Sequence, residues 1–451
     1  MGSFVFLLLI LFLLFVTVSI TGHFRRARSI LWFAGVVVVI WIVHRWPVNG
    51  PVILFRHIVI YMDKQTTIGR LVFHVDTAAR MGMHLALVNA LVGSIIILAL
   101  PTLDETIPWW GIGLITTFLA VSVTSPWAWG WGVAIWAIGV LAVAYGGWPT
   151  LSRRAWTWLL LPLLSTLLLF MLLAEETLAI THVASWRVHL IALFLLGFSS
   201  LAPFHIGSVC LAEEGQPFGM MWGLWTHTVV FLVILSRVEG VPAYREALWT
   251  SAPFLKVMAY MTLIWAGLGG LSQQHVGRLT GYALIFNWAL TLLLWLMYPN
   301  NLDVIRWTMA VRLIGIVSVS IGLISLLSGT QSAALSSIKG WARRRTWGVL
   351  LWTLGIATLA GLPFTAGGWL LWIMPPMKVH DASLWLMLLG SVGLLVGLGR
   401  ALTVLWGPLE TPLLPREEGV ARWALWLLSM ALIVSGLIPS FVLHLGKWLV
   451  G

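Results

Sequence analysis

The ionisable side chains that could do chemistry in this sequence are few, and the most informative ones lie inside long apolar runs. His227 lies in the middle of such a run between Thr226 and Thr228, and Lys256 and Arg312 lie near the starts of two others. An ionisable residue inside an apolar span is energetically costly, so it indicates an ion pathway or a proton relay. The structural alternative is a neutral histidine bonded to a helix carbonyl, and a lysine or arginine that reaches the membrane interface.

Other reactive side chains give weaker indications. Glu213 and Glu214 are expected in a solvated loop, and Asp76 is expected to form a structural ion pair with Arg80, four residues further on. The single cysteine, Cys210, excludes disulfides, a cysteine-ligated zinc site and an iron–sulfur cluster made by this chain alone. No phosphate-binding loop, dinucleotide fingerprint or nucleophile elbow is present. The sequence therefore predicts no catalytic centre, no metal site and no cofactor in this chain.

The composition places these residues in a membrane protein. Of 451 residues, 60% are hydrophobic and 9% are charged, and the mean hydropathy is +0.97. A chain this apolar cannot cover its surface as a water-soluble domain. The net charge is 26 minus 15, or +11, but the basic residues lie between apolar runs. They therefore predict an orientation in the lipid bilayer and no nucleic-acid partner.

Apolar runs of membrane-spanning length follow one another along the chain. They predict an all-α membrane protein with about 14 transmembrane helices, at residues 3–22, 29–48, 83–101, 109–124, 127–147, 156–174, 188–203, 219–237, 252–272, 279–298, 309–328, 346–376, 383–405 and 422–447.

Two of these runs are interrupted by proline. The run at 346–376 is too long for one plain helix and carries Gly361 and Pro363, so a broken helix is expected near Pro363, and a second break is expected near Pro203. These matching breaks indicate probable inverted repeats. The interrupted segment 49–82 predicts a short interfacial or hairpin element.

A single polytopic membrane domain, 1–451, is therefore expected. Residues 70–410 would form its core, with N-terminal spans and an interfacial segment at 1–69 and a C-terminal span at 411–451.

Three basic clusters indicate the orientation of the spans. Four predicted spans separate the first cluster from the second and six separate the second from the third, so all three face one side, which is predicted to be the cytoplasm. No basic residue precedes the first apolar run, which is therefore expected to be a retained span with its N-terminus outside. The predicted location is a bacterial or archaeal plasma membrane, or an organelle inner membrane. The clusters are Arg25/Arg26/Arg28, Arg153/Arg154 and Arg343/Arg344/Arg345.

Four short segments resemble one family in order and spacing. Pro203-Phe204-His205 resembles its "PFH" segment, and 273–282 (QQHVGRLTGY) resembles its turn between two helices. Residues 359–368 (LAGLPFTAGG) resemble its break in the twelfth helix, and 73–76 (FHVD) its entry to the third span. The sequence is identified, over roughly 70–410, as resembling the antiporter-like, proton-channel membrane subunits of complex I (NADH:quinone oxidoreductase). Relatives occur in membrane-bound hydrogenases and multisubunit sodium/proton antiporters.

The resemblance implies a respiratory-chain subunit that supports proton transport coupled to electron transfer. Other membrane subunits of the assembly would be its partners, and partner subunits would supply flavin, iron–sulfur clusters and quinone. It implies that His227 substitutes for a lysine of the eighth helix and that Arg312 takes the place of a histidine. The candidates for a proton path are thus His227, Arg312, Lys256, His205 and Arg278, with Asp76, Pro203 and Pro363 as structural motif residues.

Departures from the family pattern are as informative as the matches. The resemblance implies a glutamate in the fifth helix where Trp131-Gly132 stands, a lysine where Phe198 stands, and a charged residue where Gly368-Trp369-Leu370 stands. A proton wire needs titratable groups in sequence, and arginine does not release its proton. We therefore expect a divergent subunit with either residual proton translocation through His227 or a structural role.

Two alternatives remain open at this point. One is a stand-alone cation/proton antiporter or other secondary transporter. The other is a membrane anchor of a hydrogenase-type complex, which would recruit a soluble enzyme through the face that carries Arg343–Arg345.

Overall fold

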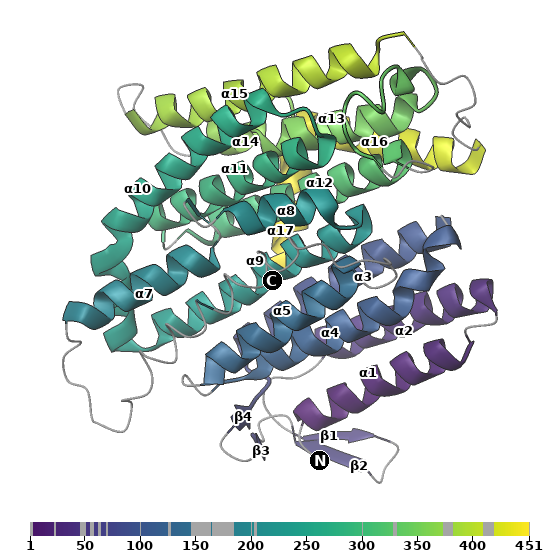
Figure 1. Cartoon of the computed structure of the whole chain (residues 1–451). Coiled ribbons are helices and arrows are strands. Elements are labelled where there is room, and N and C mark those ends of the chain that lie inside the picture. Colours follow the sequence, from purple (N-terminus) through teal and green to yellow (C-terminus); the bar gives the residue numbers. More distant parts are fainter. Residues whose placement is uncertain are drawn as a thin grey trace. The chain divides into compact units, whose positions relative to one another are not determined.

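The structure is a computed structural model with all side chains, and its helices dominate (Figure 1). The residues that it describes are 3–21, 24–45, 51–54, 58–61, 65–68, 71–99, 101–124, 128–145, 164, 185–199, 201–202, 205–299, 301–327, 332–372, 382–408 and 419–450.

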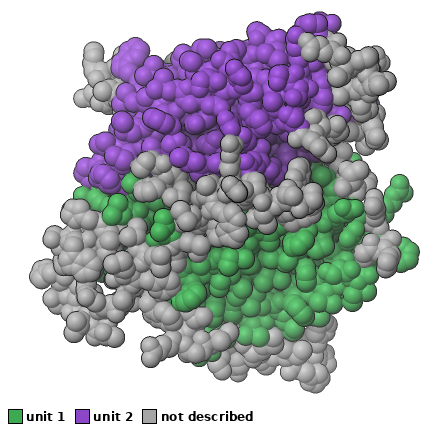
Figure 2. All heavy atoms as spheres, in the orientation of Figure 1, with its two compact units in different colours: residues 1–151, 159–199, 222–252 green, residues 152–158, 200–221, 253–451 purple. Residues whose placement is uncertain are grey.

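The chain divides into two compact units, coloured green and purple in Figure 2. Unit 1 comprises residues 1–151, 159–199 and 222–252, and unit 2 comprises residues 152–158, 200–221 and 253–451.

Unit 1 is built from long apolar helices that pack side by side. Its first helices form neighbouring pairs, α1 with α2, α2 with α3, α3 with α4 and α4 with α5. The bounds are α1 (Ser3–Ile20), α2 (Arg25–Arg45), α3 (Thr77–Ala99), the 3-10 helix η2 (Pro101–Thr106), α4 (Ile107–Ser122), α5 (Trp129–Tyr145), α7 (Ser185–Phe198) and most of α9 (Pro217–Gly240).

The segment between α2 and α3 confirms the expectation of a hairpin element. Strand β1 (Pro51–Leu54) pairs antiparallel with β2 (Ile58–Tyr61), and β3 (Thr66–Ile68) pairs antiparallel with β4 (Leu71–Phe73). These four short strands form two separate two-stranded sheets.

Unit 2 is centred on α11, which is almost completely buried and packs against α8, α12, α13 and α15. Its elements are α8 (Ile206–Glu214), most of α10 (Pro242–Ser272), α11 (Val276–Met297), α12 (Leu302–Leu327), the 3-10 helix η4 (Trp341–Arg343), α13 (Thr346–Leu359), α14 (Gly368–Trp372), α15 (Ala382–Leu405), α16 (Gly419–Leu437) and α17 (Pro439–Val450).

The helices follow the predicted spans closely. Every predicted span overlaps one of the helices bounded above except 156–174, of which the structure describes Leu164 alone. Seven of the described helices are long and apolar enough to cross a bilayer, or eight if the bent pair α16 and α17 counts as one span. The protein is thus an integral, multi-pass membrane protein, whereas the number 14 and the inverted repeats stay predictions.

The predicted break near Pro363 is confirmed. Helix α13 ends at Leu359 and α14 begins at Gly368, because proline has no N–H and its ring blocks a continuous helix. The freed backbone groups find partners inside the protein, as a membrane requires. The Leu362 amide donates to Ala357 O at 2.9 Å, and Ser391 Oγ donates to Ala360 O at 2.6 Å.

Pro203 lies outside the described residues, and the described chain shows only that α7 ends at Phe198 and α8 begins at Ile206.

The segment predicted as a C-terminal span at 422–447 is not one straight helix. The segment forms two helices, α16 and α17, that are bent by 102° at their junction. Pro439 is the first residue of α17, where its missing N–H costs nothing and its fixed φ suits a new helix. Helix α17 packs against α12 within unit 2.

A stripe of glycines brings α10 and α15 into close contact. A Cβ at Gly393 would lie 2.6 Å from Gly267 O, and one at Gly397 would collide with Gly270 O. Such small residues let two membrane helices approach backbone to backbone. The close contact depends on the missing Cβ atoms.

We expect Gly393→Ala to destabilise unit 2 by about 1–3 kcal/mol, because the added methyl overpacks the α10–α15 contact. Thermal unfolding can be followed with a dye that fluoresces on reaction with Cys210 as that buried thiol becomes exposed. Gly399→Ala on the same helix is the matched control, since nothing lies within 4 Å of its added Cβ. A Gly393→Ala protein that melts at or above the wild-type temperature would contradict this account.

Candidate functional site

His227 is held by a backbone carbonyl. Its Nε2 lies 2.5 Å from Phe198 O, the last carbonyl of α7, which the end of that helix leaves without an intrahelical donor. A carbonyl only accepts hydrogen bonds, so Nε2 carries a proton and donates it. This contact matches the structural alternative for His227, a histidine bonded to a helix carbonyl.

Aromatic rings surround the imidazole. The ring centroid of His227 lies 5.7 Å from that of Trp136 and 5.2 Å from that of Phe198, and Phe231 stacks on Phe198. We call Trp136, Phe198 and Phe231 the His227 cage. Trp136 Nε1 donates to Thr226 Oγ1 at 3.0 Å, so the polar atom of this cage residue is used within the cluster. All of these side chains are buried.

The fifth-helix residue that faces His227 is not the one expected from the resemblance. Trp131 is 51% exposed, whereas Trp136 is fully buried against the imidazole. Five residues correspond to about 500° of helix rotation, so the two tryptophans point about 140° apart. The sequence analysis did not identify Trp136, and only its buried α5 face could have indicated it.

Arg312 is the most deeply buried cation among the described residues of unit 2, with 1% of its surface exposed. It lies ten residues after Leu302, where α12 begins, and not near the start of the span as predicted. Its Nη1 donates to Leu284 O at 3.2 Å and to Asn287 Oδ1 at 3.3 Å. The guanidinium lies 4.9 Å from the ring centroid of Trp288, a cation–π geometry. Neutral acceptors and an aromatic face thus stabilise the charge.

Lys256 also lies deeper in its helix than predicted. Helix α10 begins at Pro242, fourteen residues before Lys256, so this lysine is nearly four turns into the helix and not one turn. Its side chain is half-buried.

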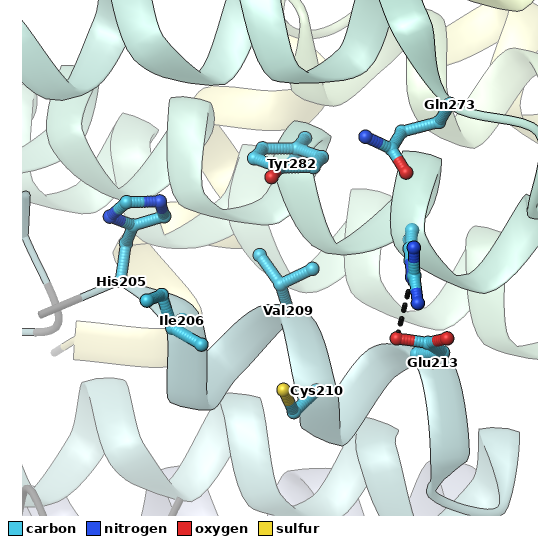
Figure 3. A pocket seen from close by; sticks show the side chains of 8 residues that line it. His205, Ile206, Val209, Cys210, Glu213, Gln273 and Tyr282 are labelled. Atoms are coloured by element: carbon cyan, nitrogen blue, oxygen red, sulfur yellow. Dashed lines mark ion pairs between the residues drawn. The ribbon is translucent and has the colours of Figure 1, made fainter. Parts of the chain in front are cut away.

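A polar pocket of about 270 Å³ lies within unit 2, between α8, the α10–α11 turn and the first turns of α11. Figure 3 shows His205 and Ile206 at one end of it, Gln273 and Glu213 at the other, and Tyr282 between them. The pocket therefore brings together two predicted site residues, His205 and Arg278.

The pocket contains an ion pair that the sequence analysis missed. Arg278 Nε lies 2.7 Å from Glu213 Oε2, and the Glu213 side chain is only 11% exposed. The expectation that Glu213 is a solvated loop residue is therefore wrong, since it lies at the end of α8 and is paired. The partners are 65 residues apart, so no local spacing could have indicated the pair.

Two histidines lie in this part of unit 2, His205 at the other end of the pocket and His275 near the ion pair. His205 is 6% exposed, its ring lies against Trp265 and Tyr282, and its Nδ1 has no hydrogen-bond partner among the described residues. His275 lies in the α10–α11 turn. Burial lowers the pKa of His275, Glu213 raises it and Arg278 lowers it further, so the neutral imidazole is favoured.

Asp76 connects three helix ends in unit 1. Its carboxylate accepts a hydrogen bond from the Ala79 amide at 2.6 Å, which caps α3, and lies 3.4 Å from Arg237 Nη2. Arg237 also donates to Val121 O and Val123 O at the end of α4. The sequence analysis considered Arg80 as the partner of Asp76, and the structure adds Arg237 from α9.

No group of three histidine, cysteine, aspartate or glutamate side chains that could hold a metal ion occurs in the part of the chain that the structure describes. Among the described residues, the pocket in unit 2 brings together several titratable side chains, including His205, Glu213 and Arg278. His227 and Arg312 each have a local environment that satisfies them as hydrogen-bond donors.

We expect Arg312 and Asn287 to be strongly coupled. Asn287→Leu removes one acceptor from a buried guanidinium and should cost about 1–3 kcal/mol of unfolding free energy, whereas Arg312→Met with Asn287→Leu removes both partners together. A double-mutant cycle in thermal or denaturant unfolding should give a coupling energy of about 1 kcal/mol or more. Strictly additive effects would show that the contact contributes nothing.

Comparisons with known proteins agree with this architecture, although no protein-family model matches the chain. The chain is 27% identical over 264 residues to NADH-quinone oxidoreductase subunit N of Chromohalobacter salexigens, an alignment that spans 55% of this chain and 54% of that protein. The chain thus matches about half the length of this curated relative.

Three solved structures share the fold over almost the whole chain. One is respiratory complex I from Thermus thermophilus with bound aureothin (18% identity, TM-score 0.69, 97% of this chain and 98% of that chain). The second is the membrane-bound sulfane sulfur reductase, an archaeal respiratory membrane complex (16%, 0.70, 98% and 96%). The third is the Mrp complex from a Dietzia species (12%, 0.72, 98% and 96%). The chain thus shares its fold with a chain of each of these three complexes, and over about half its length it is similar in sequence to NADH-quinone oxidoreductase subunit N.

Proposed function

We propose that this chain is a membrane-arm subunit of a complex I-type respiratory assembly and that it acts there as a scaffold without a proton channel of its own. Other membrane subunits are its partners. Flavin, iron–sulfur clusters and the quinone site belong to other subunits of the assembly. The plasma membrane of a bacterium or archaeon, with the N-terminus outside, is the proposed location.

The observation that carries this proposal is the His227 cage. A proton relay needs a group that gains and loses a proton while neighbouring groups change charge. His227 donates to the Phe198 carbonyl and contacts the rings of Trp136 and Phe198. Protonating the imidazole there would place a charge among aromatic rings and a carbonyl in the membrane interior, which costs free energy. These contacts therefore support a structural role for His227.

Arg312 supports the same conclusion. The resemblance gives this position to a titratable histidine, and arginine stays protonated at every physiological pH. A permanent cation that is held by Asn287 and Trp288 repels a proton that approaches it in the membrane interior. Arg312 is therefore proposed as a fixed charge and not as a step in a proton path.

Independent ion transport is the second candidate function. It is favoured by the fold shared with the Mrp complex, whose TM-score of 0.72 is similar to the values for the respiratory assemblies. Fold similarity at this identity does not distinguish these two functions, whereas the partners of the chain do.

We expect the chain, purified in mild detergent from its native membrane, to bring with it flavin- and iron–sulfur-binding subunits identified by mass spectrometry. A scaffold has large contacts with its neighbours and should co-purify in constant proportion to them. Recovery of the chain alone, or only with other copies of itself, would contradict the subunit assignment and favour independent transport.

We expect His227→Phe to leave proton translocation per electron unchanged in the intact assembly, because the substituted ring fits the aromatic cage and no proton passes through position 227. The measurement is the ratio of protons moved to electrons transferred in membrane vesicles. His444→Phe on α17 is the matched control, since His444 is exposed and its Nδ1 lies 2.7 Å from Ser440 O of its own helix. A ratio that falls in His227→Phe while electron transfer persists would establish a proton path through His227.

A further inference from the structure

The pocket beside His205 presents one positive and one negative charge at its polar end. Arg278 forms its ion pair with Glu213 through Nε, and its side chain is 39% exposed. A guanidinium that uses one nitrogen for a carboxylate can donate to a phosphate with the others. The pair therefore offers a site for an anionic group beside a site for a cationic group.

Neutral polar groups extend both halves of this site. Gln273 Nε2 donates to Gly269 O at 2.8 Å, which leaves the amide oxygen of Gln273 as an acceptor in the lining of the pocket. The Tyr282 hydroxyl and the His205 imidazole line the same pocket, and the buried Nδ1 of His205 has no hydrogen-bond partner among the described residues. An unpaired buried polar atom is costly, so it indicates that something else is bound nearby.

An apolar surface continues outward from the pocket. Ile206 of α8 lines the pocket, and Trp265 of α10 packs its ring against His205 at a centroid distance of 5.7 Å. Ile206, Trp265 and Leu268 are all more than half exposed. Trp265 and Leu268 are three residues apart on α10 and share one helix face. In a membrane protein, such exposed apolar side chains contact acyl chains.

We propose that this pocket binds the headgroup of a zwitterionic phospholipid with a primary ammonium group, of the phosphatidylethanolamine type. Its phosphate accepts hydrogen bonds from Arg278 and Tyr282, and its ammonium donates to Glu213 and Gln273. The acyl chains then lie along Ile206, Trp265 and Leu268.

The charges of the pocket decide among headgroups. A net anionic headgroup such as phosphatidylglycerol has no ammonium to donate to Glu213, and a quaternary ammonium has no N–H to donate to Glu213 or Gln273. The site therefore selects phosphatidylethanolamine over phosphatidylglycerol and phosphatidylcholine. This assignment is independent of the scaffold function proposed above.

The full chain in nanodiscs of equimolar phosphatidylethanolamine, phosphatidylcholine and phosphatidylglycerol tests the assignment. Lipid that stays bound after transfer to the gas phase is identified by native mass spectrometry. We expect the wild type to retain phosphatidylethanolamine at about tenfold enrichment over the other two lipids, the effect of one charge-assisted hydrogen bond. Retention of the three lipids in their bulk ratio would overturn the proposal.

Variants locate the binding site. Arg278→Gln and Glu213→Gln should each abolish the enrichment, and Val209→Phe, which keeps both charges and fills the pocket, should do the same. Asp303→Asn is the matched control, because it breaks the exposed Asp303–Arg306 ion pair of unit 2 and should retain the lipid. Enrichment that persists in Val209→Phe and in both charge variants would place the lipid elsewhere and overturn the assignment.

Two further measurements separate a lipid from other ligands. The single cysteine, Cys210, lines the pocket, so its alkylation by N-ethylmaleimide should be slower in phosphatidylethanolamine nanodiscs than in phosphatidylcholine nanodiscs. Equal rates would contradict occupancy of the pocket. Free phosphoethanolamine at millimolar concentration should not displace the lipid, because it lacks acyl chains. Displacement would show that the pocket takes a soluble compound and not a membrane lipid.

Discussion

The structure depends on one constraint: inside a bilayer, every backbone and side-chain polar group must find its partner within the protein. Helices satisfy this requirement for most of the chain, and the places where helices stop are the informative ones. The break at Pro363 is stabilised by the Leu362 amide and by Ser391, and the end of α7 is stabilised by His227. In both cases a side chain or amide from the same unit satisfies a carbonyl that the broken helix leaves free.

The same constraint explains the buried charges. Arg28 Nη2 lies 2.6 Å from Asp104 Oδ2 in unit 1, and both side chains are largely buried. This member of the first basic cluster is therefore not a solvent-exposed charge. Arg312 is stabilised by neutral acceptors and an aromatic face. A buried charge without such contacts would cost several kcal/mol of folding free energy. Each of these cations therefore requires a carboxylate, a neutral acceptor or an aromatic ring beside it. A role in stability therefore accounts for these cations without any movement of ions.

Tryptophan side chains fill space between the helices of each unit. Trp136 fills the face of α5 toward His227, and Trp352 Nε1 donates to Thr280 Oγ1 at 2.9 Å within unit 2. A large ring with one donor packs tightly between helices and satisfies its own polar atom. The helices can thus be packed tightly at such positions without a titratable residue.

The sequence by itself determined the class of the protein. Apolar runs of spanning length place the helices, and the proline at 363 predicts the break, because hydropathy and the missing proline N–H act locally along the chain. Only the tertiary structure decided which residues meet. The Glu213–Arg278 pair, the contact of Arg237 with Asp76 and the His227 cage all join segments that are distant in sequence. The bend between α16 and α17 was also missed, since a proline allows either a kink or a new direction and packing against α12 selects between them.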